Sequence, residues 1–168
     1  MTTDPNDAAG RIAAFLDGAM IVVTASDGAE HGGCLVGFHT QASIEPWRHL
    51  VAVSVANHTF RVASRADHLA VHLLGAGDAA LAERFGGVSE DDVADKFAGL
   101  RWHPSEHGAP ILDDCSGGWF VGRIVERVPL GDHHGMVLEP VTVGAIPDAD
   151  RRPLRFGAVR RIEPGHPA

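Results

Sequence analysis

The sequence has little cysteine, no long apolar run and fewer basic than acidic residues. Its two cysteines, Cys34 and Cys115, lie far apart and show no paired metal-ligand spacing, which argues against a disulfide scaffold or a cysteine-rich metal site. The apolar stretch at residues 19–25 has the length of a strand and is too short to span a membrane. With 14 basic and 22 acidic residues the formal net charge is −8, so neither nucleic acid nor an anionic membrane is expected as a partner.

The chain also lacks internal repeats, low-complexity linkers and a secretion signal. Residues 1–7 are polar and acidic, without the basic start and apolar core of a signal peptide, so we expect a cytoplasmic protein with reduced thiols. A length of 168 residues with 45% hydrophobic and 21% charged residues is typical of one globular domain. We therefore predict a single domain over residues 1–168, with an N-terminal helix within residues 1–17 and a flexible tail over residues 162–168.

Short apolar runs separated by glycine, aspartate, asparagine or proline predict a mainly β protein. Helical patterns occur near the N-terminus and in the middle of the chain, where capping residues and acidic first turns are present. A closed or nearly closed antiparallel barrel with a few peripheral helices accounts for this order, because closure removes exposed sheet edges. Strands are expected at residues 20–24, 33–38, 50–55, 69–74, 119–128, 136–143 and 154–159, and helices at residues 6–18, 59–65, 78–85 and 89–97.

Polar side chains gather where two of these predicted strands end, the second of them immediately before a short helix. Hydroxyl and amide groups at a helix N-terminus can bind a phosphate, but they can equally cap the helix and shape the turn. Residue spacing alone leaves both interpretations open. The side chains concerned are Thr40, Gln41 and Ser43 after the first strand, and Ser54, Asn57 and Thr59 after the second.

Six short motifs occur in an order that matches one protein family. Residues 33–46 resemble a pattern in which a Gly-Met-Thr-type strand leads through Phe-Thr-Ser-x-Ser to an Asp-Pro-Pro turn. The other five motifs are Arg84-Phe85 at a helix end, residues 95–99 (Asp-Lys-Phe-Ala-Gly), residues 108–112 (Gly-Ala-Pro-Ile-Leu), the Gly-Asp-His turn at 131–133, and residues 153–161 with their paired arginines. In this order the motifs resemble the flavin reductase-like family. The resemblance spans roughly residues 18–161 and implies a Greek-key FMN-binding split β-barrel of six or seven strands with peripheral helices.

The resemblance also implies a homodimer that binds FMN, or FAD, near the subunit interface and reduces it with NADH or NADPH. The sequence does not distinguish between the two flavins or between the two nicotinamides. A monooxygenase that receives the reduced flavin is a further partner implied by the family alone. Hydride passes between the cofactors themselves, so this activity requires no nucleophile or acid-base pair from the protein.

Residue roles follow from the same resemblance, by position in the motifs. His133 would place the nicotinamide, and it is the one catalytic residue that the resemblance implies. Phe38, His39, Thr40, Gln41 and Ser43 would line the isoalloxazine, where His39 stands at a position usually held by an aromatic residue. Ser54, Asn57, His58 and Thr59 would hold the ribityl phosphate, and Arg84, Phe85, Lys96 and Phe97 would border the flavin and the nicotinamide.

Several alternatives remain beside this hypothesis. Residues 75–80 (Gly-Ala-Gly-Asp-Ala-Ala) are similar to a dinucleotide-binding fingerprint. The Asp78 carboxylate would, however, lie where the negatively charged pyrophosphate binds, so a tight turn with an Asp78 cap is favoured. The eleven histidines show no metal-ligand spacing, so no metal site is expected. Phe85 and Phe97 could be core residues, and the two cysteines are expected to be unreactive. A flavin-binding protein without turnover, or a split barrel that holds haem or a deazaflavin, would share the same fold.

Overall fold

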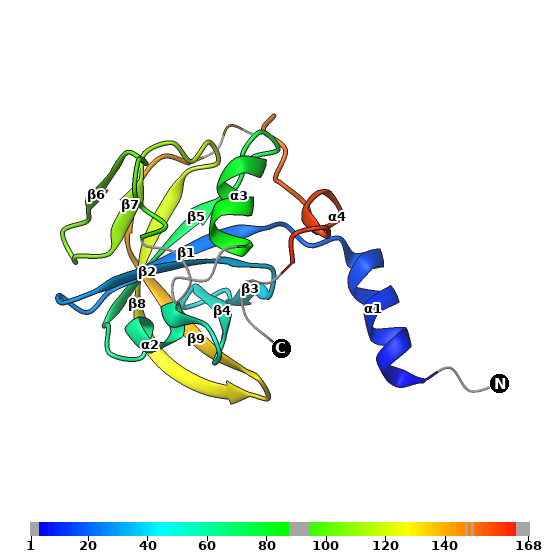
Figure 1. Ribbon diagram of the computed structural model, residues 1–168. Coiled ribbons are helices and arrows are strands. Elements are labelled where there is room, and N and C mark those ends of the chain that lie inside the picture. Colours follow the sequence, from blue (N-terminus) through cyan, green and yellow to red (C-terminus); the bar gives the residue numbers. More distant parts are fainter. Residues whose placement is uncertain (1–3, 88–94, 147, 149, 164–168) are drawn as a thin grey trace.

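The computed structural model describes residues 4–87, 95–146, 148 and 150–163 (Figure 1). Within these residues the chain forms a mostly antiparallel β structure with four helices around it. In chain order the elements are α1 (Pro5–Leu16), β1 (Ile21–Ser26), β2 (His31–Val36), β3 (His39–Ser43), β4 (Arg48–Ser54), α2 (His58–Ala63), β5 (His68–Leu73), α3 (Ala79–Gly86), β6 (Trp102–Pro104), β7 (Pro110–Leu112), β8 (Trp119–Leu130), β9 (His133–Val143) and α4 (Phe156–Val159).

Seven of the strands form one antiparallel sheet in the order β2-β1-β5-β8-β9-β4-β3. The two edge strands, β2 and β3, are consecutive in the chain and are joined by Gly37 and Phe38 alone. A connection of two residues reaches roughly 10 Å, so the sheet must roll up until its edges meet. Within the described residues no ladder joins β2 to β3, and the cylinder is therefore a split barrel of Greek-key type.

The barrel interior explains the unbroken apolar run at the start of β1. Ile21 and Val23 point into the interior cluster, whereas Val22 packs on the outer face beneath α3, so both faces of the strand are buried. Helix α2 adds Val62 and Ala63 to the interior cluster. The rest of this interior is formed by side chains of β2, β4, β5, β8 and β9, among them Val36, Val51, Val53, Leu69, Val71, Met136 and Leu138.

A second cluster covers the outer face of β1 and β2. Phe85 from α3 and Phe97 from the following turn are each 1% exposed and pack edge to face with ring centroids 5.4 Å apart. Met20, Leu74 and Leu154 complete the layer together with α4. Burial of two phenylalanines contributes several kcal/mol of hydrophobic stabilisation, which fixes α3 against the barrel.

Most of the elements expected from the sequence are present within one to three residues of the predicted bounds. The prediction was wrong for residues 154–159, where a strand was expected and α4 is found. Extended pairing lasts only through the bridges at Pro153 and Arg155. The next two backbone N–H groups, of Phe156 and Gly157, donate to the Gly18 carbonyl and the Asp17 carboxylate, and the chain then coils.

Three further differences concern the middle of the chain. Residues 39–43 form strand β3, for which no strand was predicted, and the short hairpin of β6 and β7 was missed. Residues 88–94 of the helix predicted at 89–97 lie outside the described residues, and residues 95–97 form a turn with Asp95 at φ 53°. The tail predicted at residues 162–168 falls largely outside the described residues as well. No described helix has the length and apolar character needed to cross a bilayer.

Candidate functional site

Three strand ends converge at one place on the barrel. Ser54, the last residue of β4, is paired with His133, the first residue of β9. Beyond this pair, the Val55 N–H donates to the Asp132 carbonyl at 3.0 Å, and the Phe38 carbonyl accepts from Ala52 at 2.9 Å. The rings of Phe38 and His133 consequently lie 5.1 Å apart, although 94 residues separate them in the chain. This convergence is the candidate site.

His133 is held in a defined orientation by its neighbour. Its Nδ1 donates to the Asp132 carboxylate at 2.7 Å, and this hydrogen bond lowers the pKa of Asp132. Because a carboxylate only accepts, Nδ1 carries the proton and Nε2 of the neutral ring is an acceptor. The turn that presents the ring requires Gly131 at φ 71°. Phe38 beside it is 62% exposed, so an aromatic face is open to a planar ligand.

The turn into α2 forms the next part of the site. Asn57 is the N-cap of α2, since its side-chain oxygen accepts from the Thr59 N–H at 2.9 Å, and the Ser54 hydroxyl accepts from the Ala56 N–H. The capping interpretation is thus confirmed for Asn57, and a cap at Thr59 was wrong. The Thr59 hydroxyl is fully buried and has no hydrogen-bond partner within the described residues. His58 lies next to it, with Nδ1 3.0 Å from the Arg61 guanidinium.

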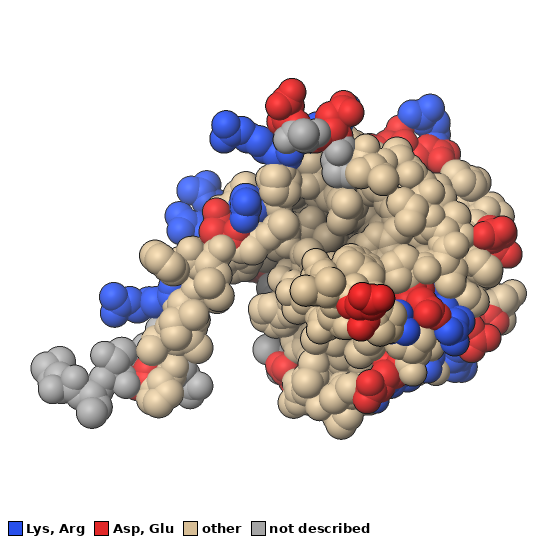
Figure 2. All heavy atoms as spheres, turned by 180° about the vertical axis from the view of Figure 1, so that it is seen from behind, with Lys and Arg blue, Asp and Glu red and all other residues tan. Residues whose placement is uncertain are grey.

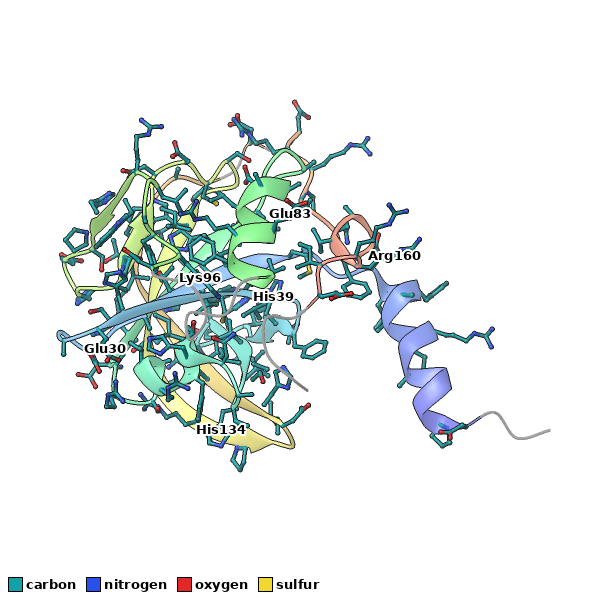
Figure 3. The ribbon with its side chains drawn as sticks, in the orientation of Figure 1. Glu30, His39, Glu83, Lys96, His134 and Arg160 are labelled. Carbon is teal, nitrogen blue, oxygen red and sulfur yellow. The ribbon has the colours of Figure 1, made fainter. Side chains whose placement is uncertain are left out.

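Strand β3 exposes its three central residues, and its two end residues are half-buried. Thr40 and Gln41 are exposed, and Ser43 is half-buried with its carbonyl accepting from the Gln41 amide. His39 instead turns inward (Figure 3): its Nε2 donates to the Ala19 carbonyl at 2.7 Å, and its Nδ1 lies 3.2 Å from Nε2 of His49. Burial lowers the pKa of both histidines, that of His49 to about 4. A neutral histidine pair therefore fixes the base of β3 where an aromatic residue was expected.

Arg84, Phe85, Lys96 and Phe97 lie in the outer hydrophobic cluster against β2. The Arg84 guanidinium donates to the carbonyls of Lys96 and Ala98, and so fastens the turn at 95–99 to α3. The Lys96 ammonium is buried and donates to carbonyls of Gly33 and Phe85. The core interpretation of the two phenylalanines is confirmed by their burial. Contact of these four residues with a flavin or a nicotinamide stays a prediction.

The alternative chemistries find little support in the structure. Among the described residues no group of three or more His, Cys, Asp or Glu side chains could hold a metal ion. The Asp78 carboxylate makes no cap for α3; it accepts from Gly75, and from the backbone and hydroxyl of Ser116. The sheet is antiparallel throughout, which rules out a dinucleotide-binding βαβ unit at residues 75–80. Burial raises the pKa of Cys115 to about 11, and Cys34 is buried, so neither is an activated thiol.

Comparison with known proteins agrees with the sequence motifs. The profile of the flavin reductase-like domain matches residues 12–163, nearly the whole chain. The chain belongs to the flavin reductase-like family. Its barrel is shared with the NADH:FAD oxidoreductase SgcE6 of Streptomyces globisporus, solved with NAD and FAD fragments, at a TM-score of 0.78 over 95% of this chain and 94% of that one. The identity is 24%, so this likeness establishes the fold.

Two curated relatives of this flavin reductase-like chain are reductase parts of monooxygenase systems. The flavin-dependent monooxygenase reductase subunit HsaB of Mycobacterium tuberculosis is 27% identical over 164 residues, which cover 96% of this chain and 84% of HsaB. The reductase component of the flavin-dependent trigonelline monooxygenase of Acinetobacter baylyi is 27% identical over 119 residues. These cover 71% of this chain and 37% of that protein, so the chain spans little more than a third of its length.

The site residues of this flavin reductase-like barrel thus fall into three groups. Phe38, Ser54 and His133 meet at the converging strand ends, with Asn57 and Thr59 on the adjoining turn. His39, the first residue of β3, points inward, and Phe85, Lys96 and Phe97 form a separate buried layer with the half-buried Arg84. Asp132 and His49 were missed as supporting residues. The Gly-Asp-His turn held a signal for Asp132. The contact of His49 with His39 depends on the β3–β4 pairing, which sets His49 opposite Gln41 and diagonal to His39.

Proposed function

We propose that this protein is a flavin reductase that transfers hydride from NADH or NADPH to FMN or FAD. The observation that carries the proposal is the junction of Phe38, Ser54 and His133 at converging strand ends of a flavin reductase-like barrel. Phe38 and His133 come from two different motifs of the family resemblance, and Ser54 ends the strand that follows the first of them. No local sequence pattern explains why an exposed phenylalanine and a histidine meet at this junction. A planar ligand bound between nucleotide-binding segments would explain their meeting.

The residues present fit a flavin. A buried hydroxyl without a partner costs free energy in the isolated protein, and Thr59 carries one at the start of α2. A phosphate oxygen at this turn would accept the hydrogen bond that the Thr59 hydroxyl lacks. Thr40 and Gln41 on β3 add exposed polar groups of the kind that the pyrimidine edge of an isoalloxazine requires.

The chain's own residues bind and orient the two cofactors. Bound flavin supplies the hydride acceptor, and the nicotinamide supplies the hydride. Phe38 offers a face for stacking, and His133 presents Nε2 as an acceptor for the carboxamide N–H of the nicotinamide. Asp132 fixes the tautomer that makes this possible. The protein's contribution is to hold the two rings at reacting distance and to exclude water.

The wider setting rests on the family and on the relatives. HsaB and the trigonelline reductase are both named as reductase parts of flavin-dependent monooxygenases. Their names support a monooxygenase as the protein that receives the reduced flavin. We infer a cytoplasmic homodimer with the flavin near the subunit interface, and a single functional domain over residues 1–168. The exposed apolar side chains at the rim of the site, including Phe38 and Val55, are consistent with an interface there.

A steady-state assay of the purified protein tests the proposal. NADH and NADPH oxidation are followed separately, with FMN, with FAD and without flavin. Flavin-dependent oxidation of either nicotinamide is the expected result, and the four combinations give both preferences. Flavin binding, seen as quenched flavin fluorescence, without nicotinamide oxidation would leave a flavin-binding protein and refute the reductase. A visible spectrum of haem or deazaflavin in the purified protein would refute the flavin assignment itself.

A further inference from the structure

Helix α1 stands apart from the barrel that follows it in the chain. Figures 1 and 2 show it projecting as an arm, with open space between the helix and the rest of the molecule. Ile12, Phe15 and Leu16 share one face of the helix and are 58%, 89% and 68% exposed. A single exposed apolar side chain is common on a protein surface. Three on one face of an isolated helix form an apolar surface of the kind that binds another protein surface.

The root of this arm is fixed, so its direction is part of the fold. Asp17 ends the helix at φ 43°, and its carboxylate accepts from the Gly157 N–H at 2.7 Å. The Gly18 carbonyl accepts from Phe156 at 2.9 Å, and the Asp17 carbonyl accepts from the Arg155 guanidinium at 3.1 Å. These contacts with α4 hold α1 away from its own barrel and make a fold-back onto the same chain unfavourable.

A second exposed apolar surface flanks β3, which among the described residues is the last strand of the sheet and has one unpaired edge. We call it the β3 edge patch. Phe38 and Val55 lie at one end of it and are 62% and 43% exposed, and Ile44 and Trp47 lie at the other end and are 84% and 38% exposed. An open sheet edge flanked by apolar side chains is a site where soluble proteins place a cover. Phe38 belongs to the candidate site, so whatever covers this patch also borders the flavin.

The apolar face of α1 matches one end of the β3 edge patch. Ile12, Phe15 and Leu16 span about 6 Å along the helix axis, whereas Phe38 and Ile44 lie six residues apart on an extended segment, roughly 20 Å. The helix face can therefore cover Phe38 and Val55. The exposed fractions of these five side chains correspond to roughly 650 Å² per chain, close to the area one partner contributes to a stable interface. Since each chain carries both surfaces, α1 of each copy can cover the β3 edge patch of the other in a closed two-fold dimer.

We propose that α1 is an exchanged arm that lies along the β3 edge patch of a second copy of this chain. Phe15 of one protomer then forms part of the wall of the partner's flavin pocket, which is incomplete in a single chain. The inference rests on the homodimer of the proposed function. It adds which segment crosses the interface and which residue the second copy contributes to the site.

Substitution within α1 gives the first test, measured on the full-length protein. Phe15→Asp places a charge on the apolar face, and Ala14→Asp makes the same change on the opposite, exposed face of the same helix turn. By light scattering the wild type and Ala14→Asp are expected to be dimers and Phe15→Asp a monomer. Flavin affinity, from fluorescence quenching without nicotinamide, should fall about tenfold or more in Phe15→Asp alone. A monomeric wild type, or a dimeric Phe15→Asp with unchanged affinity, would overturn the proposal.

A cross-linking experiment separates exchange between chains from contact within one chain. Tagged Phe15→Cys and untagged Val55→Cys proteins are mixed, allowed to exchange subunits, and treated with a short bis-maleimide. A cross-linked species containing one tagged and one untagged chain is expected, and mixed wild-type chains control for Cys34 and Cys115. Absence of that species, or an intrachain cross-link in the Phe15→Cys and Val55→Cys double variant, would reject the exchanged arm. Neither outcome depends on hydride transfer, so failure here is distinct from failure of the reductase assay.

Discussion

Replacement of Thr59 by valine should have opposite effects on the stability of the free protein and on its affinity for FMN. Valine has nearly the shape of threonine, but it removes the buried hydroxyl that has no partner. An unsatisfied buried hydroxyl costs ~1–3 kcal/mol, so Thr59→Val should raise the free energy of unfolding by about 1 kcal/mol. In a chain of this size that corresponds to a rise in melting temperature of ~2–4 °C.

Binding of FMN should weaken in the same variant, because the hydroxyl can no longer donate to the phosphate. A hydrogen bond to a charged group contributes ~1.5–3 kcal/mol, which corresponds to a loss of roughly ten- to a hundredfold in FMN affinity. Riboflavin lacks the phosphate, so its affinity should stay the same. Fluorescence quenching titrations with both ligands measure the two affinities, and thermal unfolding of the flavin-free protein measures stability.

Asn57→Ala is the matched control, because it removes a side chain from the same turn that already has a partner. Loss of the N-cap should lower stability by about 1 kcal/mol, the sign opposite to that of Thr59→Val. The reasoning would be refuted if Thr59→Val lowered the melting temperature of the free protein. Equal losses of FMN and riboflavin affinity would remove Thr59 from the phosphate site.

Three further variants address other parts of the molecule. His133→Ala should raise the KM for the nicotinamide roughly tenfold with little change in flavin affinity, and unchanged steady-state kinetics would remove His133 from the site. Burial lowers the pKa of His72 from 6.5 to about 4. Between pH 6.5 and pH 4 the unfolded chain therefore binds a proton at this histidine that the folded chain does not. Acidification over this pH range should lower the free energy of unfolding by about 3 kcal/mol. Denaturant unfolding at several pH values should show a weaker dependence in His72→Gln. Gly33→Ala should cost ~1–3 kcal/mol, since its Cβ would lie 2.6 Å from the Phe85 ring, and wild-type stability would contradict the observed packing.

The neutral state of His72 has a geometric cause as well as a desolvation cost. Its Nδ1 donates to the Val22 carbonyl, and its Nε2 accepts from the Leu112 N–H. A second ring proton would point at the Leu112 N–H and break that bond. His72 therefore ties β5 to β1 and β7 only in its neutral form. The sequence contains no local signal for this role, because His72 and its two partners lie on three different strands.

Local sequence determined the features that depend on neighbours in the chain. The apolar run at residues 20–24 predicted a strand, and glycine at position 131 predicted the turn that presents His133. The same local reasoning was wrong at residues 154–159. There the apolar spacing permits a strand, but the Gly18 carbonyl and the Asp17 carboxylate accept from the next two backbone N–H groups, and a helix turn follows.

The sequence by itself determined the strand-rich class, the order of the elements and, through its motifs, the family and the segments that build the site. Only the tertiary structure decided which side chains meet. The register of β4 with β9, together with the Phe38–Ala52 hydrogen bond, brings Phe38 to His133, and β3 turns His39 inward while Thr40 stays exposed. Propensity and capping act over a few residues, whereas register and barrel closure depend on contacts between distant strands, and a single sequence does not display those contacts.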